Sequence, residues 1–417
     1  MSTVDFPVGE RIHATPLNLK HPLNLSSRDF IHNEYAYYAW LRREAPVYKG
    51  KFSVMNLYFI SRYDDVVEVL KDKRFIRNRA NAFGGSRLPF PAPKVLQSMA
   101  SSMILEDEPE HRRLRNLVHK AFTPQTVGNL AGRIESLTHQ LLDEAERAGQ
   151  VDLVQAYALP IPITVIADML GVPESDRPTF LKYSQSFQGM PNALTFLRWY
   201  LNIRSIDGYT RDLIARRRAD PQDDLLTALI QAEDDDEQLS EDELVSMVIL
   251  LLFAGYETTV NLIANGVWAL LQHPDQLQRL RDDMSLMDSA IEEILRYDSP
   301  VGGTKPMYAS EDIALHGVTI PKKAAVMALV GSANRDETIF TNPDQFDIAR
   351  SPNKHIGFGQ GIHYCLGAPL ARLEGKIALT NLLKRAPNLR LAVEPAAVKY
   401  VTRPMWHRLE NLPVRLD

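Results

Sequence analysis

The chain has 417 residues, a formal net charge of −5, 45% hydrophobic residues and 24% charged residues. These values are typical of a soluble globular protein, and the acidic balance does not favour nucleic-acid binding, which usually needs a basic domain. Cys365 is the single cysteine, which excludes a disulfide, a cysteine zinc cluster and an iron–sulfur cluster within the chain and fits a reducing compartment.

Nothing in the sequence divides the chain into separate domains. It has no glycine/serine linker, low-complexity tract or internal repeat, so we expect one domain over residues 1–417. Residues 1–25 contain neither an apolar leader nor an apolar run of about 18 residues. The sequence therefore predicts a soluble, cytoplasmic protein without a membrane anchor.

The first part of the chain alternates short helices and strands. Tyr35, Tyr38 and Leu41 have helical spacing, and the run SVMNLYFI is typical of a strand. A segment with Gly84, Gly85 and three prolines favours a loop. In chain order we expect an irregular stretch at 1–33, a helix at 34–44, strands at 46–48 and 53–60, a helix at 63–70 and a loop at 77–93.

The middle of the chain is predicted to be helical. Pro109 suits a first helical turn, after which His111 and Arg115, four residues apart, share one face. Successive helices are expected over 125–235. A capping box of Ser240 and Glu243 then begins a proline-free helix over 241–272, which Pro274 ends.

The long predicted helix contains an unusual central segment, Ala254-Gly255-Tyr256-Glu257-Thr258-Thr259. Its acid and threonines interrupt an apolar run, and burying them is costly unless they are hydrogen-bonded. Departures of this kind are expected at functional sites. Glu293 and Arg296, three residues apart further on, can pair on one helical face. Strands are expected to pair between 313–320 and 324–329.

Cys365 lies in a dense local pattern, Phe358-Gly359-x-Gly361-x-His363-x-Cys365-x-Gly367, just before a predicted helix that begins at Ala368. Backbone N–H groups at such a junction stabilise a thiolate and lower its pKa. A lone thiolate of this kind can serve nucleophilic catalysis or single axial ligation of a metal centre such as haem.

The pattern around Cys365 resembles the haem-binding loop of the cytochrome P-450 family. Three further motifs occur in the family's order: H-x-x-x-R at His111, A-G-x-E-T-T at Ala254 and E-x-x-R at Glu293. The resemblance covers nearly the whole chain. It implies a mainly α fold with small β-sheets, in which a long central helix lies over a haem and a cysteine loop lies on its proximal side.

The resemblance also implies roles for individual residues. Cys365 would be the iron ligand of haem b, and Thr258 with Glu257 would relay protons to bound O₂. Glu293 and Arg296 would form a structural ion pair. The implied haem contacts are His111, Arg115, Ala254, Gly255, Phe358, Gly359, Gly361 and His363. The implied substrate contacts are Phe83, Leu88, Phe90, Ala254 and Val301.

Two positions depart from the family pattern. Met307 stands where relatives usually have an arginine that contacts a haem propionate, with Lys305 as a possible substitute. Gln345 stands where an arginine or histidine often joins the E-x-x-R pair, so Arg335 or Arg350 would have to replace it. No flavin or iron–sulfur segment is present, so electrons from NAD(P)H are expected to arrive through an acidic ferredoxin. Its implied docking residues are Arg112, Arg113, Arg372 and Lys376.

The resemblance implies a monooxygenase that inserts one atom of O₂ into a mainly hydrophobic small molecule of secondary or xenobiotic metabolism. Two alternatives remain open. A peroxygenase driven by H₂O₂ would not need the acid–threonine relay, and turnover with H₂O₂ alone would favour it. A catalytically silent binding or recruitment module would keep the fold and lose the relay.

Overall fold

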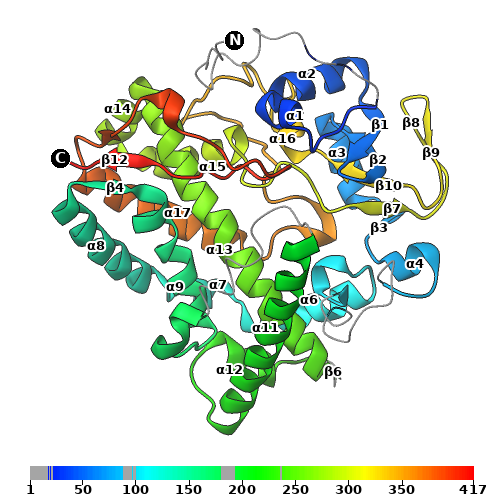
Figure 1. The fold of residues 1–417 in the computed structure, drawn as a ribbon, viewed down its shortest axis with the longest axis horizontal. Coiled ribbons are helices and arrows are strands. Elements are labelled where there is room, and N and C mark those ends of the chain that lie inside the picture. The colour runs from blue at the N-terminus through cyan, green and yellow to red at the C-terminus, as the bar shows by residue number, and fades with distance from the viewer. Residues whose placement is uncertain are drawn as a thin grey trace. The chain divides into compact units, whose positions relative to one another are not determined.

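A computed structural model describes residues 22–87, 100–179, 193–234 and 237–417, with Leu17, Leu19 and Leu96. The chain divides into two compact units. Figure 1 labels the helices and strands. Unit 1 comprises residues 1–76, 135–158 and 258–417, and unit 2 comprises residues 77–134 and 159–257. The expectation of one domain over residues 1–417 stays a prediction.

Unit 1 contains a mixed sheet of five strands in the order β1-β2-β10-β7-β3. Only β2 and β10 are parallel, with Tyr58 opposite Val326, and the other neighbours are antiparallel. Apolar side chains of this sheet pack with those of α3, including Val66, Val69 and Met307. The strands are β1 (Val47–Phe52), β2 (Met55–Ile60), β3 (Phe75–Ile76), β7 (Met307–Ala309) and β10 (Ala325–Ala328).

In unit 1, α15 and α17 pack against each other. The helices that lie wholly in unit 1 are α1 (Arg28–His32), α2 (Glu34–Glu44), α3 (Tyr63–Lys71), α14 (Pro274–Asp282), α15 (Met287–Tyr297), α16 (Val330–Ala333) and α17 (Ala368–Arg385). A second sheet has the order β11-β12-β4, formed by Arg390–Leu391, Pro413–Arg415 and Gln150–Asp152.

Unit 2 is built mainly from helices. Arg217 of α11 links two of its segments, because its guanidinium donates to the Gly171 carbonyl at 2.9 Å and pairs with Asp224 at 2.8 Å. Its elements are α4 (Arg79–Phe83), α6 (Glu110–Ala121), α7 (Pro124–Gly128), α9 (Pro160–Met169), α11 (Ala193–Ala219), α12 (Leu225–Gln231), β5 (Glu233–Asp234) and β6 (Glu237–Gln238).

Two helices run through both units: α8 (Ala131–Ala148) and α13 (Glu241–Gln272). The predicted capping box at the start of α13 is present, since Ser240 N–H donates to the Glu243 carboxylate at 2.8 Å. Among the described residues α13 is the helix long and apolar enough to cross a membrane, and 67% of its apolar window is buried inside the protein. Such burial is typical of a core helix.

Several local predictions are wrong. The predicted loop at 77–93 contains α4 (Arg79–Phe83), which the Asn78 side chain caps. The predicted helical stretch 125–235 contains β4 (Gln150–Asp152). Residues 28–32 form α1, because Ser27 caps the helix through its side chain and Phe30 is buried in the core. Residues 313–320 form a hairpin of β8 (Ile313–Leu315) and β9 (Val318–Ile320), whereas β10 pairs with β2 and β7. His316 and Gly317 between β8 and β9 both have positive φ, which is typical of a tight two-residue hairpin turn.

Candidate functional site

Cys365 lies in a closed loop immediately before α17. Its backbone N–H donates to the Phe358 carbonyl at 2.9 Å, which folds the loop back on itself. Gly359 and Gly361 have φ values of +74° and +70°, a conformation that L side chains rarely adopt. A Cβ on Gly361 would also lie 2.3 Å from the Leu70 carbonyl oxygen at the end of α3. Glycine is therefore required here for conformation and for close approach.

The donor set of this loop fits a haem iron. Cys365 is half-buried and is the only thiol of the chain. His363 lies two residues before it in a single 3-10 turn, Gly361–His363. A single cysteine thiolate is the protein ligand that thiolate-bound haem uses.

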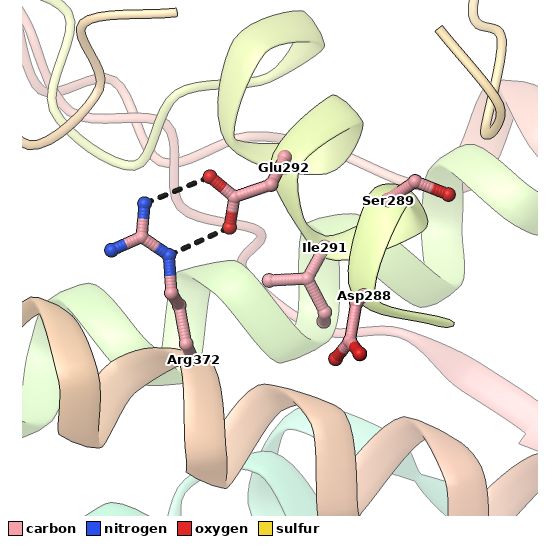
Figure 2. Close-up of a pocket in the computed structure, with 5 residues that line it drawn as sticks. All are labelled: Asp288, Ser289, Ile291, Glu292 and Arg372. Carbon is pink, nitrogen blue, oxygen red and sulfur yellow. Dashed lines mark hydrogen bonds and ion pairs between the residues drawn. The ribbon is translucent and has the colours of Figure 1, made fainter. Parts of the chain in front are cut away.

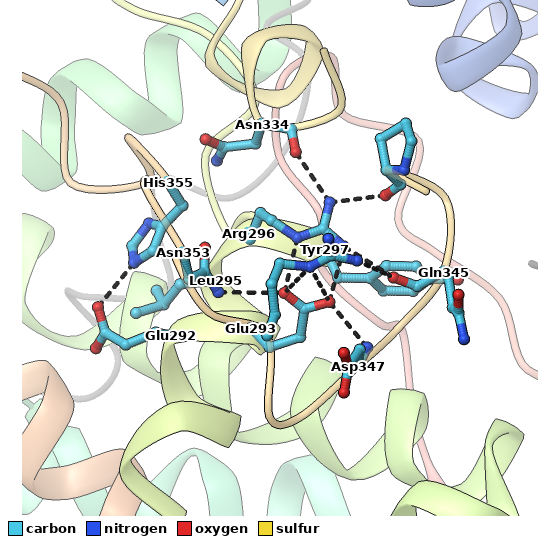
Figure 3. Close-up of polar contacts among 12 residues, drawn as sticks. Glu292, Glu293, Leu295, Arg296, Tyr297, Asn334, Gln345, Asp347, Asn353 and His355 are labelled. Carbon is cyan, nitrogen blue, oxygen red and sulfur yellow. Dashed lines mark hydrogen bonds and ion pairs between the residues drawn. The ribbon is translucent and has the colours of Figure 1, made fainter. Parts of the chain in front are cut away.

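The E-x-x-R residues form a buried ion pair on α15. Arg296 Nε and Nη2 donate to the two Glu293 carboxylate oxygens at 2.7 and 2.8 Å, and both side chains are 0% exposed. Arg296 also donates to three backbone carbonyls, those of Asn334, Pro343 and Gln345, at 2.7–3.0 Å (Figure 3). The pair therefore satisfies several buried polar groups of the segment that leads to the cysteine loop.

Arg350 takes the place that Gln345 leaves open. Its Nε lies 3.1 Å from the Glu293 carboxylate, and its Nη2 donates to the Gln345 carbonyl at 2.9 Å. Gln345 thus contributes its backbone oxygen to the network. Arg335 pairs instead with Asp344 at 2.9 Å and donates to the Tyr297 carbonyl. Of the two candidates from the sequence, Arg350 joins Glu293.

The A-G-x-E-T-T segment lies in the middle of α13, which continues as a helix through it. Glu257 is buried, Thr258 is half-buried and Ala254 is exposed. A Cβ on Gly255 would lie 3.4 Å from the Ile166 side chain of α9, so the absence of a side chain permits close packing there.

Glu374 of α17 is a functional candidate that sequence reasoning missed. The side chain is 1% exposed, and burial raises its pKa to about 8, against a smaller opposing effect of the Thr259 side chain on α13. Thr259 directly follows Thr258. The sequence gives only a weak signal, because a glutamate in a helix is usually solvated.

We expect Glu374 to make the folded protein less stable as pH rises from about 4.5 to 8, because it keeps its proton over this range and the unfolded chain does not. Glu374→Gln should remove this pH dependence. The dependence amounts to a loss of roughly 3–5 kcal/mol at most in the free energy of unfolding between pH 4.5 and 8. Chemical denaturation at pH 5 and pH 8 measures it. Equal slopes in wild type and variant would contradict the assignment.

His111 and Arg115 lie on α6 in unit 2, as the spacing predicts. His111 is 2% exposed, and burial, with the charges of Arg115 and Arg77, lowers its pKa to about 4. His111 is therefore neutral near pH 7 and acts as a hydrogen-bonding group without charge. Arg115 donates from Nε to His119 at 3.2 Å.

The expected substrate contacts lie in different parts of the chain. Val301 forms an isolated antiparallel bridge with Trp406 in unit 1, and Phe83 of α4 in unit 2 is 38% exposed. Leu88 and Phe90 lie outside the described residues. Met307 is buried in the apolar core and supplies no polar group, whereas Lys305 is exposed.

The segment around Val301 is tied to the C-terminal part of unit 1. Gly302 N–H donates to the Met405 carbonyl at 2.9 Å, and His407 lies 2.6 Å from both the Glu34 and Asp298 carboxylates. Burial would lower the pKa of His407, but the two carboxylates outweigh it and raise the pKa to about 10. Sequence reasoning missed this charged cluster, because its members are far apart in the chain.

Each residue of the predicted docking set forms an ion pair. Arg112 pairs with Glu108, Arg113 with three glutamates, Arg372 with Glu292 and Lys376 with Asp288. Arg112 is the most exposed of the four at 67%. These pairs reduce the positive field that the four residues can project into solvent.

Comparison with known proteins agrees with the family resemblance and the fold. The family model "Cytochrome P450" matches residues 16–386. The chain is 40% identical over 397 residues to the polyketide biosynthesis cytochrome P450 PksS of Bacillus subtilis, which covers 94% of this chain and 97% of the relative. It is also 40% identical over 400 residues to 6-deoxyerythronolide B hydroxylase of Saccharopolyspora erythraea, which covers 94% and 98%.

Solved structures give the same result. The PksS structure from B. subtilis superposes with a TM-score of 0.89 and 39% identity, covering 95% of this chain and 100% of that one. P450BioI in complex with an acyl carrier protein ligated to hexadec-9Z-enoic acid gives 0.85 and 39%, covering 93% and 100%. The chain belongs to the cytochrome P450 family, and it is an oxidoreductase of the monooxygenase type.

Proposed function

We propose that Cys365 binds the iron of haem b and that the chain inserts one atom of O₂ into a mainly hydrophobic small organic substrate. The observation that supports this most is the closed loop around Cys365, with its backbone bond to Phe358 and its positive-φ glycines. When bound, the haem supplies the redox and O₂ chemistry, and the protein supplies orientation and protons.

The roles of the other residues are part of the same proposal. Thr258 and Glu257 deliver protons to the reacting oxygen. The buried, neutral His111 and the charged Arg115 bind the haem propionates from α6. Phe358, Gly359, Gly361 and His363 contact the haem from the cysteine loop, and Ala254 and Gly255 let α13 approach it closely.

The relatives support a biosynthetic substrate. Their names refer to polyketide biosynthesis, biotin biosynthesis and hydroxylation of 6-deoxyerythronolide B, and one solved relative is in complex with an acyl carrier protein ligated to hexadec-9Z-enoic acid. We infer a hydrophobic intermediate of secondary metabolism or a xenobiotic that contacts Val301, Phe83 and Ala254. We also infer, from these bacterial relatives, a soluble cytoplasmic enzyme. A spin-state titration with fatty acids, steroids and macrolactones, free and carrier-linked, would identify the substrate class.

Electrons are proposed to come from NAD(P)H through an acidic ferredoxin that docks on Arg112, Arg113, Arg372 and Lys376. Arg372 is a poor position at which to test docking. It forms an ion pair with Glu292 inside the protein, so changing it would also remove this internal contact. Arg113 is only 21% exposed and contacts three glutamates. Arg112 and Lys376, which are 67% and 48% exposed, are therefore the better positions to change.

We expect Arg112→Glu combined with Lys376→Glu to slow reduction by the ferredoxin about tenfold or more at low salt, because charge attraction speeds docking. High salt should narrow the difference. Stopped-flow reduction of the CO-saturated protein measures the rate. Lys322→Glu, an exposed position in the turn before β10, is the matched control. A salt-independent, unchanged rate in the double variant would exclude this docking surface.

Turnover distinguishes the proposed function from its alternatives. Product that depends on O₂, NAD(P)H, reductase and ferredoxin supports the monooxygenase with an external electron donor. Faster turnover with H₂O₂ alone than with the electron-transfer partners would favour the peroxygenase. Tight substrate binding without product under both conditions would favour the catalytically silent module.

A further inference from the structure

One carboxylate, Glu292 of α15, binds two residues that flank the cysteine loop. His355 Nε2 lies 2.9 Å from Glu292 Oε2, and Arg372 donates from Nε and Nη2 to the two carboxylate oxygens at 2.6 and 2.8 Å. Figure 2 shows the paired contacts between Arg372 on α17 and Glu292 on α15. Burial would raise the pKa of Glu292, but the bonds from Arg372 and His355 outweigh it and lower the pKa to about 2.

The contacts of His355 define which of its ring nitrogens accepts and which donates a hydrogen bond. Gly357 N–H donates to Nδ1 at 3.1 Å, so Nδ1 is the acceptor nitrogen. Nε2 is then the ring nitrogen that donates to Glu292. The next residue, Ile356, donates its N–H to the Asn334 side chain at 2.8 Å. The start of the loop is thus fixed in position and orientation.

Arg372 contacts both ends of the cysteine loop, at Phe358 and at Tyr364. Its guanidinium lies over the Phe358 ring at 4.5 Å, and its Nη1 donates to the Tyr364 hydroxyl at 3.4 Å. Phe358 accepts the hydrogen bond from Cys365 N–H, and Tyr364 is the residue before Cys365. Because Glu292 fixes the guanidinium with two hydrogen bonds, it indirectly fixes both neighbours of the cysteine.

Glu292 and Glu293 divide the support of this region between them. In Figure 3 Glu293 faces Arg296 and the Asp347 backbone, whereas Glu292 faces His355 on the other side of α15. Glu292 supports the cysteine loop, and Glu293 supports the segment before it. Asp288, on the same helix and 73% exposed, pairs with Lys376 of α17.

We propose that Glu292 is a positioning residue for the Cys365 thiolate, acting through Arg372 and His355 on Phe358 and Tyr364. This rests on the proposed ligation of haem iron by Cys365. Without the Glu292 carboxylate, Arg372 loses its two-point contact and an unbalanced positive charge remains near the thiolate. The loop then loosens. The uncompensated positive charge of Arg372 stabilises the reduced iron more than the oxidised iron, so the reduction potential of the haem rises.

The test compares Glu292→Gln with Asp288→Asn, which removes a carboxylate of the same helix. We expect Glu292→Gln to lose haem to apomyoglobin about tenfold faster, the usual scale for residues that orient a metal ligand. It should also raise the haem reduction potential and convert part of the reduced CO complex to the shorter-wavelength band. Asp288→Asn should match wild type in all three. Glu292→Gln values equal to those of wild type would overturn the proposal.

A second variant tests the same proposal in case Glu292→Gln does not fold. Arg372→Lys keeps the charge but loses the two-point contact and the planar group over Phe358. It should show the same faster haem loss and spectral change, and an unaltered rate and spectrum would also overturn the proposal. The wild-type CO band is read in the same experiment. Its absence would refute ligation by Cys365, whereas a normal wild-type band with unaffected variants would refute only the role of Glu292.

Discussion

Arg296→Leu is expected to yield little or no folded protein. Glu293 would keep Arg350 as a partner, but the Asn334, Pro343 and Gln345 carbonyls would lose the donor that they share. Breaking a buried ion pair by removing one partner costs about 3–5 kcal/mol. Because a native protein is stable by only about 5–15 kcal/mol, the loss is a large fraction of the total.

Denaturant unfolding of the purified protein, or the yield of soluble protein, measures this effect. Arg279→Leu is the matched control, since it removes a 50% exposed arginine that pairs with Asp347 at 3.4 Å. A surface pair of that kind contributes about 0–1 kcal/mol. A similar stability for Arg296→Leu and Arg279→Leu would contradict the structural role of the E-x-x-R pair.

Thr258→Val should lower product formation about 100-fold while electrons are still consumed, the lower end of the range for a lost proton-transfer group. Valine keeps the branched shape and removes the hydroxyl. Without directed proton delivery to cleave the O–O bond, oxygen that has received two electrons takes up two protons from water and leaves as H₂O₂. Adjacent helix residues do not face each other, so Glu257 and Thr258 would exchange protons through water.

The measurement is product formed and H₂O₂ released per NAD(P)H consumed. Thr258→Ser, which restores a hydroxyl, should recover much of the product yield. A product-to-NAD(P)H ratio in Thr258→Val equal to that of wild type would show that the hydroxyl is not part of the relay.

Features that depend on local spacing could be predicted from the sequence. The bounds of α2 and α13, the Ser240–Glu243 cap and the helix after Cys365 follow from periodicity, capping residues and prolines. The β8–β9 hairpin was missed because its turn residues, His316 and Gly317, interrupt a short apolar run only briefly.

Features that depend on residues far apart in the sequence could not be predicted. Glu292 and Glu293 are adjacent and chemically identical, and only the folded helix shows that they have different partners. Glu292 pairs with His355 and Arg372. Glu293 pairs with Arg296 and Arg350. The same limit applies to the basic residues, because the sequence gives their charges but not the acids that neutralise them.

The CO difference spectrum of the dithionite-reduced protein tests the central claim, that Cys365 is a thiolate ligand of haem iron. The account predicts a Soret band at the red-shifted position that gives the family its name, lost in Cys365→Ser. A wild-type band at the shorter wavelength of ordinary haem–CO complexes, or no haem band at all, would contradict it.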